Sequence, residues 1–203
     1  MKYSSKTLII ILGLFLIAQF VGLSINNYYF SSELPYGLQP PQVDVSVSPW
    51  FFVSMLIIVS LIFLGLRKLK FELLMKIWFF LAFVITASIT LSAFIASWIA
   101  VILATMLIVL RMKEKDLFIH NLTEILVYGG VVAIFAPILN LWATIILLVL
   151  IAVYDFVAVN ITKHMVAMAK MQDDLGIFSG LIVISDGESA LSLIHISEPT
   201  RPY

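Results

Sequence analysis

Long runs of residues without charge constrain this chain more than any other feature. Four runs between consecutive charged residues hold 26, 22, 34 and 30 uncharged residues. They lie between Lys6 and Glu33, Asp44 and Arg67, Lys76 and Arg111, and Glu124 and Asp155. A helix of about 20 apolar residues crosses the hydrocarbon layer of a membrane. The chain is therefore predicted to be an all-α polytopic membrane protein.

The composition excludes several other classes of protein. Of the 203 residues, 62% are hydrophobic and 12% are charged, whereas a water-soluble domain carries about 25% charged residues. The 12 Lys and Arg balance the 12 Asp and Glu, so the chain lacks the basic surplus that nucleic-acid binding requires. The absence of cysteine excludes disulfides, thiolate metal sites and a cysteine nucleophile.

The two longest runs are too long for one crossing, and each is predicted to form a helical hairpin. Lys and Arg collect on the cytoplasmic side of membrane proteins, and hairpins place all the basic clusters on one side. This arrangement gives six transmembrane helices in the plasma membrane, with a cytoplasmic N-terminus. The predicted spans are residues 7–27, 49–66, 71–92, 94–110, 117–138 and 141–162, which together form a six-helix transmembrane region over residues 1–162.

The N-terminal run has two interpretations. Lys2 and Lys6 followed by apolar residues resemble a signal peptide. However, the run is long enough to span a membrane, and no small-x-small cleavage site follows Phe20. We therefore expect the first helix to be retained.

Some residues are expected to shape helix packing. Gly129 and Gly130 should allow a neighbouring helix to approach closely. Pro137 and Asn140 mark the turn between the fifth and sixth helices. The hydroxyl groups at positions 86, 88, 90 and 92 are predicted to bind their own backbone or a neighbouring helix rather than line a polar path.

Asp155 is the leading candidate for a functional residue. If Trp142 lies near the outer interface, Asp155 lies about 20 Å further in, and Thr162 about 10 Å beyond it. A charge at hydrocarbon depth costs at least about 2.5–3.5 kcal/mol. A proton relay, a cation site in a transporter and acid–base chemistry on a substrate all fit this carboxyl group, and a structural helix–helix hydrogen bond is the non-functional alternative.

Other titratable residues are weaker candidates. Glu124 is a secondary candidate for an ion site, but it lies near an inner helix end, where we expect water to solvate it. His120 and His164 also lie near cytoplasmic helix ends and are interpreted as interfacial polar residues. His195 lacks accompanying ligands for a metal. We therefore expect no metal and no cofactor.

The residues around Asp155 resemble a known motif. Tyr154-Asp155 and the following residues read YDFVAV, which resembles the YD motif of the sixth transmembrane helix in the presenilin and signal-peptide-peptidase family of intramembrane aspartyl proteases. The downstream stretch NITKHMVAMA resembles the archaeal members in particular. The resemblance is sharpest over residues 120–172.

This resemblance implies a nine-helix, presenilin-like protease that cleaves transmembrane helices with two catalytic aspartates. One of them corresponds to Asp155, and Tyr154 shapes the substrate cleft beside it. The other belongs to a GxGD motif in the seventh helix, and a PAL motif lies in the ninth. The 203 residues contain neither motif, so the chain is expected to be inactive as given. A transporter that uses Asp155 as its ion site, and a non-catalytic scaffold, are the competing interpretations.

The last 41 residues are predicted to form a cytoplasmic loop over residues 163–190 and a non-native tail over residues 191–203. The stretch KHMVAMAKMQDD forms either a short amphipathic helix on the membrane surface or an extension of the sixth helix. GIFSGLIVIS is too short to span a membrane, and we expect a frayed end there rather than a strand or gate. LSLIHISEPTRPY resembles a translated sequencing adapter, so the natural protein is expected to continue beyond this chain.

Overall fold

The structure, a computed structural model, describes residues 5–40, 44, 48–68, 71–113 and 116–183. This part of the chain is helical and contains no strand. The α-helices are α1 (Ser5–Phe30), α2 (Ser48–Lys68), α3 (Glu72–Ser92), α4 (Ser97–Lys113), α5 (Leu117–Phe135), α6 (Leu141–Phe156) and α7 (His164–Asp174). Short helical turns cover Pro35–Gly37, Ala136–Ile138 and Val157–Ile161. The predicted tail over residues 191–203 lies outside the described residues.

A helix occupies each of the six predicted ranges. The helix ends lie within three residues of those predicted, except that α6 ends six residues early, at Phe156, and the turn Val157–Ile161 covers most of the remainder. Four are long and apolar enough to cross a membrane: Ser5–Phe30, Glu72–Ser92, Leu117–Ile138 and Leu141–Ile161. The prediction of an all-helical membrane protein is confirmed at this level. That α2 and α4 also cross remains a prediction, since the part of α2 assessed for this property is the shorter apolar stretch Pro49–Ile62.

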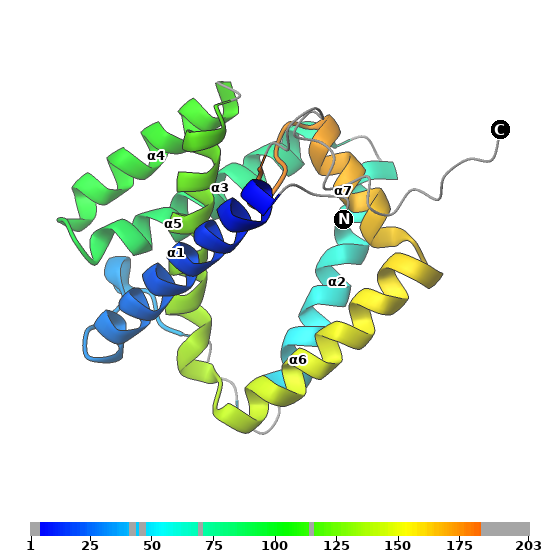
Figure 1. Ribbon diagram of the computed structural model, residues 1–203, viewed down its shortest axis with the longest axis horizontal. Helices are drawn as coiled ribbons and strands as arrows, with labels where there is room; N and C mark the ends of the chain where they lie inside the picture. Colours follow the sequence, from blue (N-terminus) through cyan, green and yellow to red (C-terminus); the bar gives the residue numbers. More distant parts are fainter. Residues whose placement is uncertain (1–4, 41–43, 45–47, 69–70, 114–115, 184–203) are drawn as a thin grey trace.

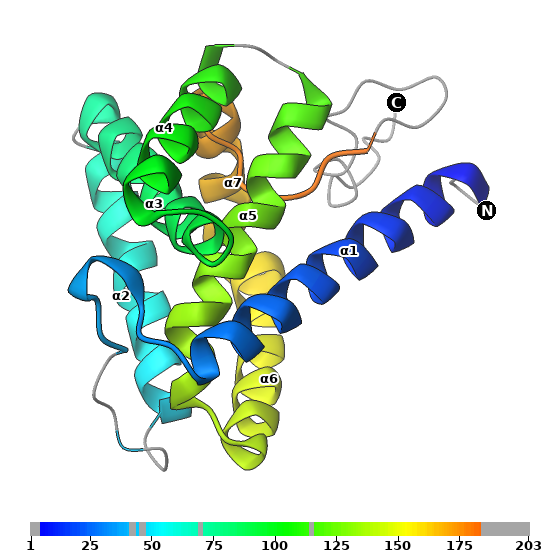
Figure 2. The same cartoon turned by 90° about the vertical axis from the view of Figure 1, so that its left-hand side faces the viewer.

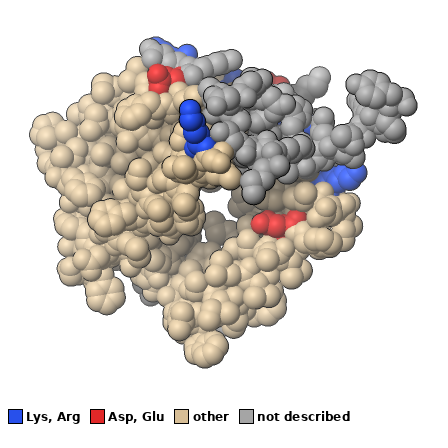
Figure 3. All heavy atoms as spheres, in the orientation of Figure 1, with Lys and Arg blue, Asp and Glu red and all other residues tan. Residues whose placement is uncertain are grey.

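The helices form two groups. Helices α1, α3, α4 and α5 pack against one another as a four-helix group, while α2 pairs with α6 and α7. Figures 1 and 2 show the α2–α6–α7 group standing beside the four-helix group and meeting it at both ends. Figure 3 shows an opening between them. The two groups are therefore joined by few elements, and those elements determine how the groups sit together.

Helices α3 and α5 approach each other closely at two glycines. A Cβ atom added to Gly130 would lie 1.9 Å from the carbonyl oxygen of Thr86, and one added to Gly129 would lie 2.7 Å from the Thr90 hydroxyl oxygen. Neither contact is possible for a real side chain. The prediction of close helix approach at this glycine pair is confirmed.

The hydroxyl groups of α3 bind backbone atoms, as predicted. Thr90 donates a hydrogen bond of 2.6 Å to the carbonyl oxygen of Leu126 on α5. Thr86 and Ser88 donate to carbonyl oxygens within their own helix at 2.8 Å each. These side chains therefore stabilise α3 and its contact with α5.

The turn between α5 and α6 confirms the prediction made from its sequence. Pro137 lies in the short turn Ala136–Ile138 that ends α5. The Asn140 side chain accepts a hydrogen bond of 2.7 Å from the backbone amide of Ala143 and so caps the start of α6. The chain reverses here, and α6 leaves the four-helix group to pair with α2.

Candidate active site

Asp155 lies in the last turn of α6, one residue before the helix ends. Its side chain is half-buried. It makes no hydrogen bond or ion pair with any other residue that the structure describes. The carboxyl group thus lies at the end of an apolar helix and has no hydrogen-bond or ion-pair partner among the described residues.

The backbone changes conformation directly after Asp155. Residues Val157–Ile161 form a π-helical turn, closed by a 2.9 Å hydrogen bond from the Thr162 amide to the Val157 carbonyl oxygen. Such turns are rare and frequently occur at functional sites. Lys163 then adopts a left-handed conformation with φ of 54°, which a residue other than glycine adopts at a cost of roughly 1–2 kcal/mol. Two uncommon backbone features therefore follow the candidate catalytic residue.

Helix α7 is a separate helix because of this break. The left-handed Lys163 directly precedes it and redirects the chain. Met171 of α7 is buried against Met75 of α3. Of the two interpretations of this segment, extension of the sixth helix is therefore wrong, and α7 instead connects the end of α6 to the four-helix group.

Tyr154 is held by two side chains from different elements. Its hydroxyl group lies 3.0 Å from the Ser60 hydroxyl oxygen on α2 and 2.8 Å from Nε2 of His164 on α7. Nδ1 of His164 lies 2.5 Å from the hydroxyl oxygen of Thr162. The structure thus brings four polar side chains together next to Asp155.

The roles of Ser60 and His164 were not predicted from the sequence. His164 was interpreted as an interfacial residue because it lies near a cytoplasmic helix end. Ten residues separate it from Tyr154, and an ideal helix would place them about 15 Å apart along its axis, beyond hydrogen-bond reach. The π turn and the left-handed Lys163 together alter that spacing. No periodic pattern in the sequence signals either feature.

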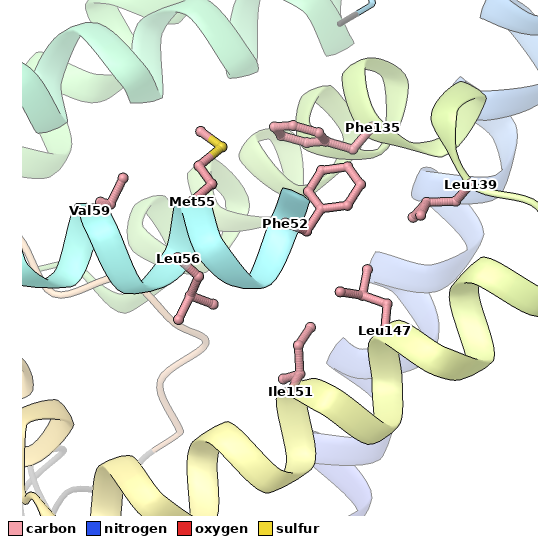
Figure 4. Close-up of a pocket in the computed structure, with 8 residues that line it drawn as sticks. All are labelled: Phe52, Met55, Leu56, Val59, Phe135, Leu139, Leu147 and Ile151. Atoms are coloured by element: carbon pink, nitrogen blue, oxygen red, sulfur yellow. The ribbon is translucent and has the colours of Figure 1, made fainter. Parts of the chain in front are cut away.

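An apolar cavity of about 410 Å³ lies between α2 and α6. Figure 4 shows its lining side chains converging from α2, α6 and the end of α5. Ile151 lines it and lies one helical turn before Asp155. A space that accepts apolar groups therefore lies next to the candidate catalytic carboxyl group.

Glu124 is fully buried, so the expectation that water solvates it is wrong. The exposed fraction of its side chain is 0%, and its Oε1 accepts a hydrogen bond of 2.5 Å from Nη2 of Arg111 at the end of α4. Arg111 also donates to the Thr123 hydroxyl oxygen at 3.1 Å, and its guanidinium lies 4.5 Å from the centroid of the Phe83 ring. Burying either charge alone would be costly, and the pairing of the two charges offsets much of that cost.

The expectation of a frayed end after α7 is also wrong for the residues that the structure describes. Ile177 and Val183 are buried, and side chains of α4 and α5 bind the backbone of the segment between them. This contact was not predictable from local sequence patterns, since its polar partners lie more than 50 residues away.

Within the residues that the structure describes, no group of three or more His, Asp or Glu side chains lies close enough to hold a metal ion. Hydroxyl and imidazole groups form the hydrogen-bonded cluster around Tyr154, and such groups transfer protons and form hydrogen bonds.

Comparison with known proteins gives one match. The family described as signal-peptide peptidase, presenilin aspartyl protease matches residues 12–201. No curated protein and no solved structure matches the chain.

Proposed function

The chain belongs to the family of signal-peptide peptidases and presenilins, which are aspartyl proteases, and on that premise we propose that Asp155 is one of two catalytic carboxyl groups. The family acts within membranes on transmembrane substrates, and the long apolar helices make this chain a multi-pass membrane protein. We propose that its reaction is hydrolysis of peptide bonds in transmembrane helices.

The position of Asp155 carries this proposal. It lies inside the candidate span Leu141–Ile161, about 9 Å from the end of that span at 1.5 Å per residue. An ionisable residue at this depth is expensive and is usually functional. The carboxyl group is half-buried and has no partner among the described residues, which supports a role in chemistry rather than in a structural ion pair.

The chemistry requires that second carboxyl group. Hydrolysis by aspartates uses one ionised carboxylate to activate water and one protonated carboxyl group to polarise the scissile carbonyl. Two such groups a few Å apart share one proton, because both cannot ionise. The 203 residues contain no GxGD, so we expect this chain alone not to cleave peptides.

The surroundings of Asp155 favour a helical, apolar substrate. The cavity between α2 and α6 is lined by apolar side chains and begins one turn from Asp155. Tyr154, fixed by Ser60 and His164, forms the wall beside the carboxyl group. A scissile bond must also leave its helix locally, because helical hydrogen bonds shield the peptide group.

The orientation in the membrane follows from the charges. Arg111 and Lys113 lie in the last turn of α4, and Lys163 directly follows the π turn after α6. Since positively charged loops face the cytoplasm, we propose that these helix ends are cytoplasmic and that the N-terminus is on the same side. We also retain six crossings in the plasma membrane as part of this proposal.

The structure argues against Glu124 as an ion site, which weakens the ion-transport alternative. Glu124 is paired with Arg111 and has no exposed surface. An ion site must exchange its ligand with water, and a buried, neutralised carboxylate does so poorly. Proteolysis therefore remains the function that the site supports best.

The test is cleavage of a reporter transmembrane substrate by the product of the full reading frame in lipid vesicles. Asp155→Asn removes the ionisable group and should reduce the cleavage rate by at least about a thousandfold, as for other essential catalytic groups. Asp173→Asn, which changes an exposed acid on α7, is the matched control and should leave the rate unchanged. Cleavage by Asp155→Asn at the control rate would refute the proposal.

A further inference from the structure

Three side chains at the junction of α4 and α5 bind backbone atoms of one extended segment. Nη2 of Arg111 donates to the Phe178 carbonyl oxygen at 2.7 Å. Nε2 of His120 lies 2.8 Å from the Gly180 carbonyl oxygen. The Asn121 side chain donates to the Ile182 carbonyl oxygen and accepts from the Ile182 amide, both at 2.8 Å.

The bonded residues alternate along the segment, at positions 178, 180 and 182. Alternate carbonyl groups of an extended chain point to the same side. The helix side chains therefore bind this segment as a neighbouring strand would, through its main chain. The one polar side chain of the segment that contributes is Ser179, whose hydroxyl group lies 3.5 Å from Oε2 of Glu124.

The binding side chains are themselves held in place. Arg111 is fixed by Glu124, by the Thr123 hydroxyl group and by the Phe83 ring. The Thr123 hydroxyl group donates to the His120 carbonyl oxygen at 2.8 Å, which ties this cluster to the first turn of α5. The Arg111 side chain is therefore held by partners outside the segment as well as by the segment itself.

The segment is less completely packed on its other side. Ile182 and Val183 border a cavity of about 440 Å³ that is lined by α1 and α5, including Leu14 and Leu122. Unfilled space beside apolar side chains forfeits dispersion contacts. The polar contacts with Arg111, His120 and Asn121 therefore carry much of the attachment.

We propose that Arg111, His120 and Asn121 form a binding site for extended main chain, and that residues 178–182 occupy it as a detachable latch. The latch follows α7 directly, so its attachment ties the α2–α6–α7 group to the four-helix group at the end where α6 terminates. Because recognition uses main-chain atoms, the ligand class is an extended peptide with little requirement for particular side chains.

The experiment uses the absence of cysteine from the chain. Val183→Cys then supplies a single thiol, which is buried while the latch is attached, and its rate of labelling by a maleimide reports release. Asn121→Ala removes two hydrogen bonds and should raise that rate about thirtyfold, since each bond contributes on the order of 1 kcal/mol. Asn121→Asp keeps the acceptor for the Ile182 amide and tests the donor alone, with a smaller increase. Thr105→Ala, which removes a hydroxyl bonded within α4, should leave the rate unchanged.

A second pair of variants separates main-chain recognition from side-chain packing. Ile182→Pro removes the amide that Asn121 binds and should raise labelling, whereas Ile182→Val keeps that amide and should not. Adding Ile182→Pro to Asn121→Ala should raise labelling little further, because Asn121→Ala already removes the bond to that amide. Equal effects of Ile182→Pro and Ile182→Val would overturn the proposal.

A control thiol distinguishes release of the latch from unfolding. Ala104 on α4 is fully buried, so the thiol of Ala104→Cys should stay unreactive in the Asn121 variants. Parallel increases at positions 104 and 183 would mean that the segment belongs to the folded core, and the latch would be refuted. Unchanged labelling at position 183 in Asn121→Ala would refute the binding site itself.

Discussion

Glu124 and Asp155 are two acids in apolar helices with opposite surroundings. Glu124 is fully buried and bound by Arg111, and that arginine is bound in turn by Thr123 and a backbone carbonyl group. Asp155 is half-buried and has no such partner in the described part of the chain. The depth of an acid in an apolar run is therefore a poor guide to its role. Whether the acid has an ion-pair or hydrogen-bond partner is a better guide: Glu124 has one and is structural, whereas Asp155 has none among the described residues and is available for chemistry.

The largest effect on stability is expected at the structural pair. Arg111→Ala leaves Glu124 buried without a counter-charge, which should lower the free energy of unfolding by about 3–5 kcal/mol. Lys113→Ala, two residues away and exposed, should change it by less than about 0.5 kcal/mol. The unfolding midpoint in detergent is the measurement.

A double variant tests the cause of that loss. Arg111→Met combined with Glu124→Leu removes both charges and should recover most of the stability, because replacing a whole buried pair by apolar residues is often neutral. Equal midpoints for Arg111→Ala and Lys113→Ala would contradict the assignment of a structural role to the pair.

The next largest effect is expected where α3 and α5 touch. Gly130→Ala places a Cβ atom against the Thr86 backbone, which cannot move without shifting α3, and should cost about 1–3 kcal/mol. Gly13→Ala on α1 has open space around the added atom and should be neutral or slightly stabilising. If Gly130→Ala left stability unchanged, α3 and α5 could separate at little cost. The four-helix group would then not be more tightly packed than the contact between the two groups.

A smaller effect is expected at Tyr154. Tyr154→Phe leaves the Ser60 hydroxyl group and His164 without their shared partner, and should lower stability by about 1 kcal/mol. Tyr28→Phe changes an exposed tyrosine and should have no effect on the same unfolding midpoint. A Tyr154→Phe variant as stable as Tyr28→Phe would mean that the hydrogen bonds do not anchor α6 to α2.

The helices were predictable because their ends are marked by charge and by turn residues. The two shorter uncharged runs each cover most of one helix, and the two longer runs each cover most of a pair of helices. Gly129, Gly130 and Asn140 act through local geometry, which a sequence displays directly. The sequence reasoning placed Asp155 about 10 Å before the end of its helix; its position in the last turn was not predicted, because α6 ends at Phe156.

The missed contacts depend on distant or irregular geometry. The partners Arg111 and Glu124 come from different helices, and nothing in either helix indicates that their ends meet. The π turn and the left-handed Lys163 bring His164 to Tyr154, and no periodic pattern in the sequence indicates either feature. The backbone of residues 178–182 carries no side-chain signal at all, since its recognition uses main-chain atoms.

The smallest effect on stability should come from the residue with the largest effect on activity. Asp155→Asn removes a charge that costs at least about 2.5–3.5 kcal/mol at hydrocarbon depth, although water at the half-buried side chain offsets part of this penalty. No hydrogen bond to a described residue is lost, so the unfolding midpoint should stay unchanged or rise slightly. A loss of more than about 1 kcal/mol, comparable to that of a buried hydrogen bond, would place Asp155 with Glu124 among the structural acids. If Asp155→Asn kept its stability and lost cleavage, Asp155 would have a catalytic role and Glu124 a structural one.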